Sequence, residues 1–198
     1  MNAIARATVV AAALAVMSVP ALAQEQDSRG WYAGIGLGMS KFKGACDGVS
    51  GSGVSCDEND TAFKLFGGYQ VNRNFAVELG YTDLGKAKAS FSGFGDVSIA
   101  ASGFEALAVG IVPINPQWSL IGKLGLFRWD VDFNDGTGLV GSGSASGTNV
   151  TYALGVGYQF TPKAAVRVEY QQYKDIGDEN VTGKGDVNVI GANVLYRF

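Results

Sequence analysis

The sequence predicts an all-β fold, an eight-stranded antiparallel up-and-down transmembrane β-barrel. Three observations indicate it. Apolar residues alternate with small or polar ones at a period of two along almost the whole chain after residue 23. The connections between these segments switch between tight turns and long polar loops. No segment beyond residue 23 holds the roughly 18 consecutive apolar residues of a transmembrane helix, although 47% of the chain is hydrophobic.

The first element, residues 1–23, is predicted to be a secretory signal peptide. A single positive charge at Arg6 precedes an apolar run, which ends in small residues suited to a cleavage site before Gln24. Residues 24–198 are then expected to form one β-barrel domain. The net charge of −3 gives no basic patch for nucleic acid, so a nucleic-acid partner is not expected.

Eight alternating segments follow, and each is expected to be one strand. In the third segment, Phe75, Val77 and Leu79 lie on one face and Glu78 on the other. The eight predicted strands are 30–42, 61–70, 74–84, 103–113, 117–133, 148–160, 163–175 and 186–198.

The connections divide into two kinds. Tight turns with Asn and Pro are expected at 71–74, 114–117 and 161–163. Long, Gly-rich loops are expected at 43–60, 85–102, 134–147 and 176–185. Short turns at one end and long loops at the other describe a meander, and an even number of strands lets it close without free edges.

The composition of the two faces predicts which one meets lipid. The large apolar residues are assigned to the lipid face, because the opposite face of Ala, Gly, Ser and Thr with few charges suits a narrow lumen better than a solvated coat. Gly34, Gly36 and Gly38 are expected to leave space inside the barrel. Aromatic residues near strand ends are assigned to girdles at the two bilayer interfaces; they are Trp31, Tyr69, Phe75, Trp118, Tyr158 and Phe160.

The last strand keeps its alternation to the final residue. Val194, Tyr196 and Phe198 lie on one face, with Arg197 between the last two. In lipid every backbone donor needs a partner, so this strand is expected to be complete and to pair with the first one.

Cys46 and Cys56 lie in a polar Gly/Ser-rich segment of an exported chain, so they are expected to form a loop disulfide. A metal site is disfavoured, because two thiolates without any histidine are an incomplete ligand set. The absence of histidine also removes the usual base for acyl transfer or hydrolysis. The chain is therefore predicted not to be an enzyme and to need no cofactor.

Four charged residues are candidates for the lumen: Glu78, Lys123, Arg167 and Glu169. An inward Glu78 needs a nearby cation such as Arg167 or Lys123, because an unpaired buried charge costs several kcal/mol. Two interpretations stay open at this point. The four groups could form a gate across the lumen, or they could simply satisfy one another as a polar core.

Several segments resemble the transmembrane barrel of the OmpA family of Gram-negative outer-membrane proteins. The most specific are FGGYQVNRNFAVELGYTDLG at 66–85 and the run from RVEYQ at 167–171 to DIGD at 175–178. The resemblance extends over GWYAGIGLGMS at 30–40, GKLG at 122–125 and the terminal YRF.

The resemblance implies roles for individual residues. Glu78 and Arg167 match the interior glutamate and arginine of the family, a pair that can close the lumen as a switchable gate. The family's other gate lysine and second glutamate fall on Ala108 and Gly157, which disfavours an exchange between two salt bridges. Tyr196 and Phe198 correspond to the signal for the outer-membrane insertion machinery. The peptidoglycan-binding domain common in the family is not expected in this chain.

The predicted function is that of a structural, OmpA-like barrel with at most a small, gated pore for ions or solutes, since eight strands enclose little more than their own side chains. The alternative is a surface recognition or adhesion module whose loops, above all 43–60, bind a host molecule, a phage or a metal ion. Expected partners are outer-membrane lipids, lipopolysaccharide and the insertion machinery.

Overall fold

The computed structural model describes residues 29–46, 54–91, 95–135, 142–177 and 184–198. Within these ranges all extended elements are strands, and none of the described residues forms a helix able to cross a membrane. The predicted signal peptide lies outside the described residues. The strands are β1 (Gly30–Phe42), β2 (Val54–Asp57), β3 (Asn59–Gln70), β4 (Phe75–Phe91), β5 (Gly95–Pro113), β6 (Trp118–Asp135), β7 (Gly143–Gln159), β8 (Ala164–Ile176) and β9 (Gly185–Arg197).

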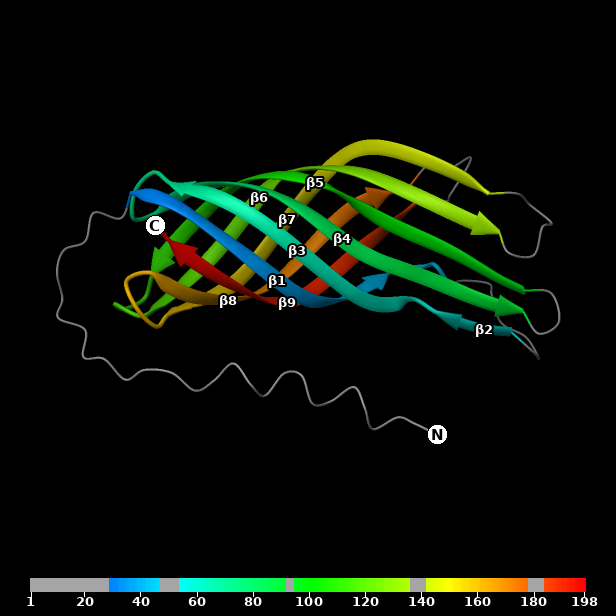
Figure 1. Cartoon of the computed structure of the whole chain (residues 1–198), viewed down its shortest axis with the longest axis horizontal. Coiled ribbons are helices and arrows are strands. Elements are labelled where there is room, and N and C mark those ends of the chain that lie inside the picture. The colour runs from blue at the N-terminus through cyan, green and yellow to red at the C-terminus, as the bar shows by residue number, and fades with distance from the viewer. Residues whose placement is uncertain (1–28, 47–53, 92–94, 136–141, 178–183) are drawn as a thin grey trace, which may run out of the picture.

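Eight strands close into one antiparallel ring, which confirms the predicted barrel (Figure 1). The order around the ring is β1, β3, β4, β5, β6, β7, β8 and β9, and β9 pairs with β1 again from Tyr32↔Arg197 to Phe42↔Val187. One additional strand, β2, is not part of the ring and pairs with the last residues of β4. The last strand therefore seals the barrel, as its uninterrupted alternation predicted.

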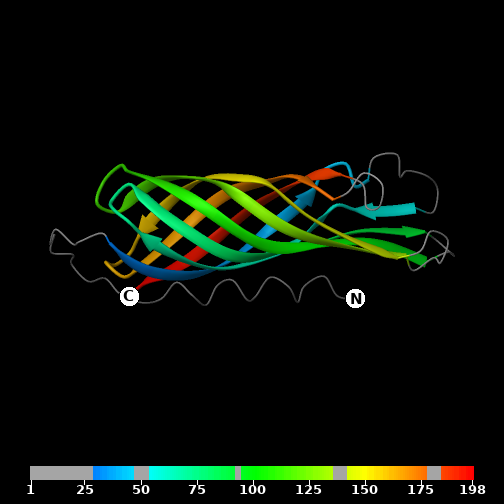
Figure 2. The same ribbon diagram turned by 90° about the horizontal axis from the view of Figure 1, so that it is seen from above.

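Two of the predicted long loops have wrong bounds, because strands fill most of 85–102 and half of 134–147. β4 and β5 stay paired up to Phe91↔Gly95, inside the predicted loop 85–102, and β6 and β7 up to Phe133↔Gly143, inside 134–147. Figures 1 and 2 show β4 to β7 running past the other strands at the end of the barrel away from the C-terminus. We call this the long-strand end. Beyond the lipid the outer face no longer needs apolar residues, so the alternation that marks a strand disappears there while backbone pairing continues.

The outer face carries the large apolar side chains, as predicted. Val77, Leu79 and Leu154 are each more than half exposed, and Glu78, between the first two, is 2% exposed. A belt of such side chains surrounds the barrel and replaces water by lipid contacts.

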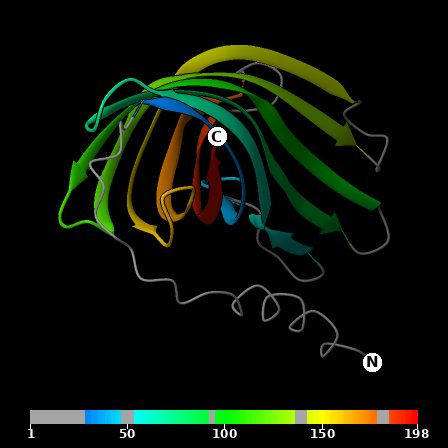
Figure 3. The same ribbon diagram turned by 60° about the vertical axis from the view of Figure 1, so that its left-hand side comes forward.

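The predicted aromatic girdles need a correction, since all six residues lie at one end of the barrel. This is the end with the short connections 71–74, 114–117 and 160–163, called here the turn end, which Figure 3 turns forward. Trp31 contacts Tyr69 there at 5.0 Å between ring centroids, and Trp118 contacts Tyr158 at 4.8 Å. Other outward aromatic side chains lie further toward the long-strand end; they are Phe63, Tyr81, Phe104, Tyr152 and Tyr170.

The glycines of β1 do point inward, but large side chains use the space that they leave. A Cβ on Gly34 would lie within 2.9 Å of two atoms of the Phe66 ring, and one on Gly36 would lie 2.0 Å from Asn193 Oδ1. The prediction that Gly34, Gly36 and Gly38 leave free space inside the barrel is therefore wrong at Gly34 and Gly36. Glycine on one strand lets bulky residues of its neighbours fill the interior.

Candidate functional site

The centre of the lumen holds a cluster of charged side chains around Glu78. Lys123 Nζ donates to Glu78 Oε2 at 2.7 Å, and Arg167 Nη1 donates to Oε1 at 2.5 Å. The hydroxyl of Tyr32 also donates to Oε1, at 2.8 Å. Both oxygens of this buried carboxylate are thus engaged by cations, which offsets the cost of taking the charge out of water.

The strands that carry this cluster lie on different sides of the ring. Glu78 belongs to β4 and Arg167 to β8, four places apart in a ring of eight, so their ion pair spans the lumen. Lys123 on β6 extends the cluster to Glu169 on β8, with 2.9 Å between Nζ and Oε2. All four predicted lumen residues therefore meet in one cluster. Their charges compensate one another, although Glu169 Oε1 is buried without a hydrogen-bond partner among the described residues. The same contacts place charge pairs across the lumen that the described strands enclose.

A second charged cluster lies beside the first and was missed by the sequence analysis. Lys64 Nζ contacts Glu105 Oε1 at 2.5 Å and donates to Gln171 Oε1 at 2.8 Å. Gln171 Nε2 donates to Glu105 Oε2 at 2.9 Å, and the Tyr173 hydroxyl donates to the same oxygen at 3.2 Å. The period of two could have found these residues, because Lys64 and Glu105 occupy inward positions of β3 and β5.

Aromatic rings support the cations of both clusters. Lys123 Nζ lies 5.4 Å from the centroid of Phe66, and Lys64 Nζ lies 5.9 Å from the same ring. The Arg167 guanidinium lies 5.4 Å from the Tyr32 ring. The faces of these rings attract positive charge, so they help hold three cations in a space with little water.

The two clusters together are electrically balanced. They hold three buried carboxylates and three buried cations, which are Glu78, Glu105, Glu169, Lys64, Lys123 and Arg167. We call these six side chains the ion-paired layer. Equal numbers of both signs lower the cost of desolvation and leave the ion-paired layer without net charge.

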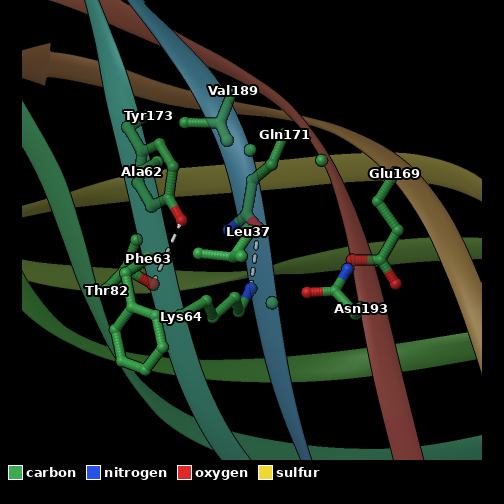
Figure 4. A pocket seen from close by; sticks show the side chains of 13 residues that line it. Leu37, Ala62, Phe63, Lys64, Thr82, Glu169, Gln171, Tyr173, Val189 and Asn193 are labelled. Atoms are coloured by element: carbon green, nitrogen blue, oxygen red, sulfur yellow. Dashed lines mark hydrogen bonds between the residues drawn. The ribbon is translucent and has the colours of Figure 1, made fainter. Parts of the chain in front are cut away.

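A small cavity adjoins the ion-paired layer (Figure 4). Its volume is about 30 Å³, and Lys64, Glu169, Gln171, Tyr173 and Asn193 are among the lining residues. Figure 4 shows Lys64 bonded to Gln171, and Tyr173 bonded to Thr82. This volume suits one or two water molecules and is far too small for a continuous aqueous channel.

Buried apolar side chains line the lumen on both sides of the ion-paired layer. Toward the turn end the cluster comprises Tyr32, Phe66, Ala76, Val109, Ile111, Ile121 and Leu195. Toward the long-strand end it comprises Phe42, Leu84, Ala87, Ala101, Phe127, Trp129, Val131, Tyr173, Ile176 and Val187. These clusters place mainly apolar side chains next to the charged groups, and apolar side chains are poor at solvating an ion.

The position matched to the family's other gate lysine needs a correction. Ala108 is exposed on the outer face, and its inward neighbours are Leu107 and Val109, which are 3% and 1% exposed. Gly157 does face the lumen, in contact range of Arg167. The inward positions beside Ala108 are apolar, so Lys123 is the second cation that reaches Glu78.

The remaining predicted site residues lie outside the lumen. Cys46 and Cys56 form the expected disulfide, with 5.9 Å between their Cα atoms. Tyr196 and Phe198 point outward at the turn end and contact each other at 5.5 Å between centroids, while the Phe198 N–H donates to Trp31 O at 3.1 Å. Among the described residues no group of three or more histidine, cysteine, aspartate or glutamate side chains could hold a metal ion.

Comparison with known families gives a match to the OmpA-like transmembrane domain over residues 26–198. Outer membrane protein A of Escherichia coli O157:H7 is 32% identical over 193 residues, covering 97% of this chain and 54% of the relative. Outer membrane protein A of Salmonella typhi is 31% identical over 195 residues, with 97% and 55% covered. The chain spans about half the length of the curated relatives it matches.

Solved structures show the same fold at lower identity. Neisserial surface protein A superposes with a TM-score of 0.60 at 14% identity, covering 85% of this chain and 97% of that chain. Ail, the attachment invasion locus protein of Yersinia pestis, gives 0.53 at 23% identity, with 84% and 99% covered. OprG of Pseudomonas aeruginosa gives 0.55 at 15% identity, with 87% and 98% covered. All three support the barrel architecture.

Proposed function

The chain belongs to the OmpA-like transmembrane domain family, and we propose that it is a structural barrel whose lumen passes at most small ions, when its ion-paired layer opens. Family and fold place it in the outer membrane of a Gram-negative bacterium, in contact with membrane lipid. Its relatives are outer-membrane barrel proteins rather than enzymes. We extend this to a barrel without catalytic activity or cofactor.

The observation that carries the proposal is the set of contacts to Glu78. One carboxylate on β4 binds Lys123 on β6, Arg167 on β8 and Tyr32 on β1. A transient pore must separate at least one of these pairs. The stable state is therefore closed, and brief openings are the most that the lumen supports.

Lys123 offers a different way to open the gate. Glu78 does not have to exchange one cation for another, because Lys123 can move between two carboxylates. Its ammonium group already contacts Glu78 and Glu169 together, at 2.7 and 2.9 Å. A small shift toward Glu169 loosens Glu78 without leaving Lys123 unpaired. Arg167 then keeps Glu78 compensated, so this movement is less costly than breaking a lone buried pair.

Single-channel recording of the refolded protein in a planar bilayer tests the proposal. Glu78→Ala is expected to raise the frequency or size of openings, because Lys123 and Arg167 lose their shared carboxylate. Glu58→Ala is the matched control: Glu58 is paired with the exposed Lys41 at the long-strand end, so its removal is expected to leave the traces unchanged. Identical traces for wild type and Glu78→Ala would overturn the gate.

A second candidate function is surface recognition at the long-strand end. β4 to β7 extend there beyond the other strands, and β2 continues the sheet along the edge of β4. The Cys46–Cys56 disulfide closes a short loop beside this edge, a constraint worth roughly 3 kcal/mol in the chain-entropy model. The projecting ends of β4 to β7, together with β2, form an extended sheet to which a host molecule or a phage can bind.

The two functions predict opposite effects of shortening the long-strand end. Replacing residues 86–100, which hold the projecting paired ends of β4 and β5, by a short Gly/Ser linker should leave conductance intact and should abolish adhesion or phage sensitivity if these strand ends carry the recognition function. Unchanged adhesion would count against recognition by these strand ends.

Proposed partners during assembly are lipopolysaccharide and the outer-membrane insertion machinery. Tyr196 and Phe198 are exposed on the outer face at the turn end, where a docking partner can reach them. Phe198→Ala is expected to reduce the heat-modifiable, folded fraction in cells while leaving refolding in detergent unaffected. Equal loss in both settings would assign Phe198 to stability instead of targeting.

A further inference from the structure

A vestibule of about 160 Å³ opens at the turn end, where Ile111, Ile121 and Leu195 of the apolar cluster form part of its wall. Its volume far exceeds the roughly 10–15 Å³ that one water molecule needs. Three arginines line it: Arg73 from the turn at 71–74, Arg167 from β8 and Arg197 from β9. None of the described residues that line the vestibule carries a carboxylate.

Arg197 has no counter-charge of its own. Its side chain is half-buried on the inward face of β9, and within the described part of the chain it forms no ion pair and no side-chain hydrogen bond. Only its backbone is bonded, with the N–H donating to Lys163 O at 2.8 Å. A partly desolvated cation without a partner is unfavourable, and a second cation beside it makes it more so.

Arg167 has more N–H donors than its bond to Glu78 uses. Its Nη1 donates to the carboxylate, while the planar guanidinium carries five N–H donors in all. Arg167 also lines the vestibule, so it connects the ion-paired layer to this second space. Arg73, exposed on the turn, adds a third cation at the entrance.

We infer that the vestibule is a binding site for a small oxyanion of the phosphate class, held by Arg197, Arg167 and Arg73. Guanidinium groups bind phosphate through paired N–H bonds, which gives geometric selectivity as well as charge. Gln70 lines the same vestibule and is 4% exposed, with its Oε1 lacking a hydrogen-bond partner among the described residues. The oxygen is itself buried, so it accepts from the protonated oxygen of a hydrogen phosphate once the Gln70 side chain rotates toward the vestibule. The site is independent of whether the lumen conducts.

Titration with inorganic phosphate tests the site. The protein is refolded in octyl glucoside, a detergent without phosphate, and the arginine Nε–Hε signals are followed by NMR. The signals of Arg197 and Arg167 are expected to shift in a saturable way. Arg128, on the outer face toward the long-strand end, serves as the internal control and should not move.

Two variants and one control make the result specific. Arg197→Gln is expected to weaken phosphate binding about tenfold or more, the usual effect of losing a charge-assisted bond. Because this residue is next to the chain end and could affect folding, Arg73→Gln provides a second variant with the same direction. Lys163→Gln removes an exposed cation at the same end that does not line the vestibule, and should leave affinity within about twofold.

Repeating the measurement in phospholipid nanodiscs without added phosphate distinguishes a lipid headgroup from a free anion as the ligand. An Arg197 signal already at its bound position identifies a lipid headgroup as ligand, and a signal that moves only on adding phosphate identifies a free anion. Either result supports the site. Non-saturable shifts, equal shifts at Arg128, or wild-type affinity in both Arg197→Gln and Arg73→Gln would overturn it.

Discussion

Arg167 on β8 and Glu78 on β4 form an ion pair between opposite walls of the barrel. Their strands are not neighbours, so no backbone ladder holds these two residues together. The pair ties the walls across the lumen, and Lys123 strengthens the connection from a third wall. Charge pairing inside the lumen therefore links strands that share no backbone hydrogen bonds.

The first prediction concerns the shared cation. Lys123→Met is expected to lower the free energy of unfolding by about 3–5 kcal/mol, because Glu78 and Glu169 lose a buried partner at once. Urea titration of the protein in detergent measures the change. Lys163→Met, an exposed lysine on a turn, is the control and is expected to stay within about 0.5 kcal/mol. A loss below about 1 kcal/mol in Lys123→Met would contradict a buried, dry pair.

The second prediction concerns Lys64 and Glu105. Each single change, Lys64→Met or Glu105→Gln, leaves the other member buried without its counter-charge and is expected to destabilise the barrel. The double variant should lose less stability than the sum of the two single variants, by about 0.5–3 kcal/mol of coupling. Additive losses in a double-mutant cycle would show that the two groups do not depend on each other.

The third prediction concerns the interlock between Gly36 and Asn193. Gly36→Ala would place a Cβ 2.0 Å from Asn193 Oδ1 and is expected to cost about 1–3 kcal/mol. Adding Asn193→Ala removes the obstructing atom and should recover most of that loss. Gly67→Ala, whose Cβ would meet its nearest atom only at 3.8 Å, is the matched control. Equal effects at Gly36 and Gly67 would point to strand propensity in place of steric contact.

The fourth prediction concerns the disulfide. Replacing Cys46 and Cys56 together by serine is expected to make the segment between them more sensitive to protease added from outside, since the covalent loop closure is lost. Conductance and refolding yield should stay unchanged, because the bond lies beyond the ion-paired layer. Lower conductance or failure to refold would show that the disulfide contributes to the stability of the barrel itself.

Alternation along the strands was enough to assign residues to the two faces. It placed Glu78 inside and Val77 and Leu79 outside, and it predicted that β9 closes against β1. Membership in pairs across the lumen could not be predicted in the same way. Which inward residues meet depends on the stagger of strands that are not neighbours. Lys64 and Glu105 were therefore missed, although the alternation along β3 and β5 places both side chains inward.

The interior volume was the other failure of prediction. Small residues on β1 suggested space, yet Phe66 and Asn193 from neighbouring strands occupy it. Phe127 and Tyr173, with ring centroids 4.6 Å apart, belong to a buried apolar cluster inside the barrel. The sequence of a single strand does not predict this packing. Packing across the lumen is a property of all eight strands together.

The central claim is that charge pairing at Glu78, and not the bulk of its side chain, holds the lumen closed. Single-channel recording of Glu78→Gln tests it most directly, because glutamine keeps the size and shape of glutamate but removes the charge that binds Lys123 and Arg167. The claim predicts openings in Glu78→Gln as frequent as those in Glu78→Ala. A silent Glu78→Gln beside a conducting Glu78→Ala would contradict it and would make Glu78 a steric plug.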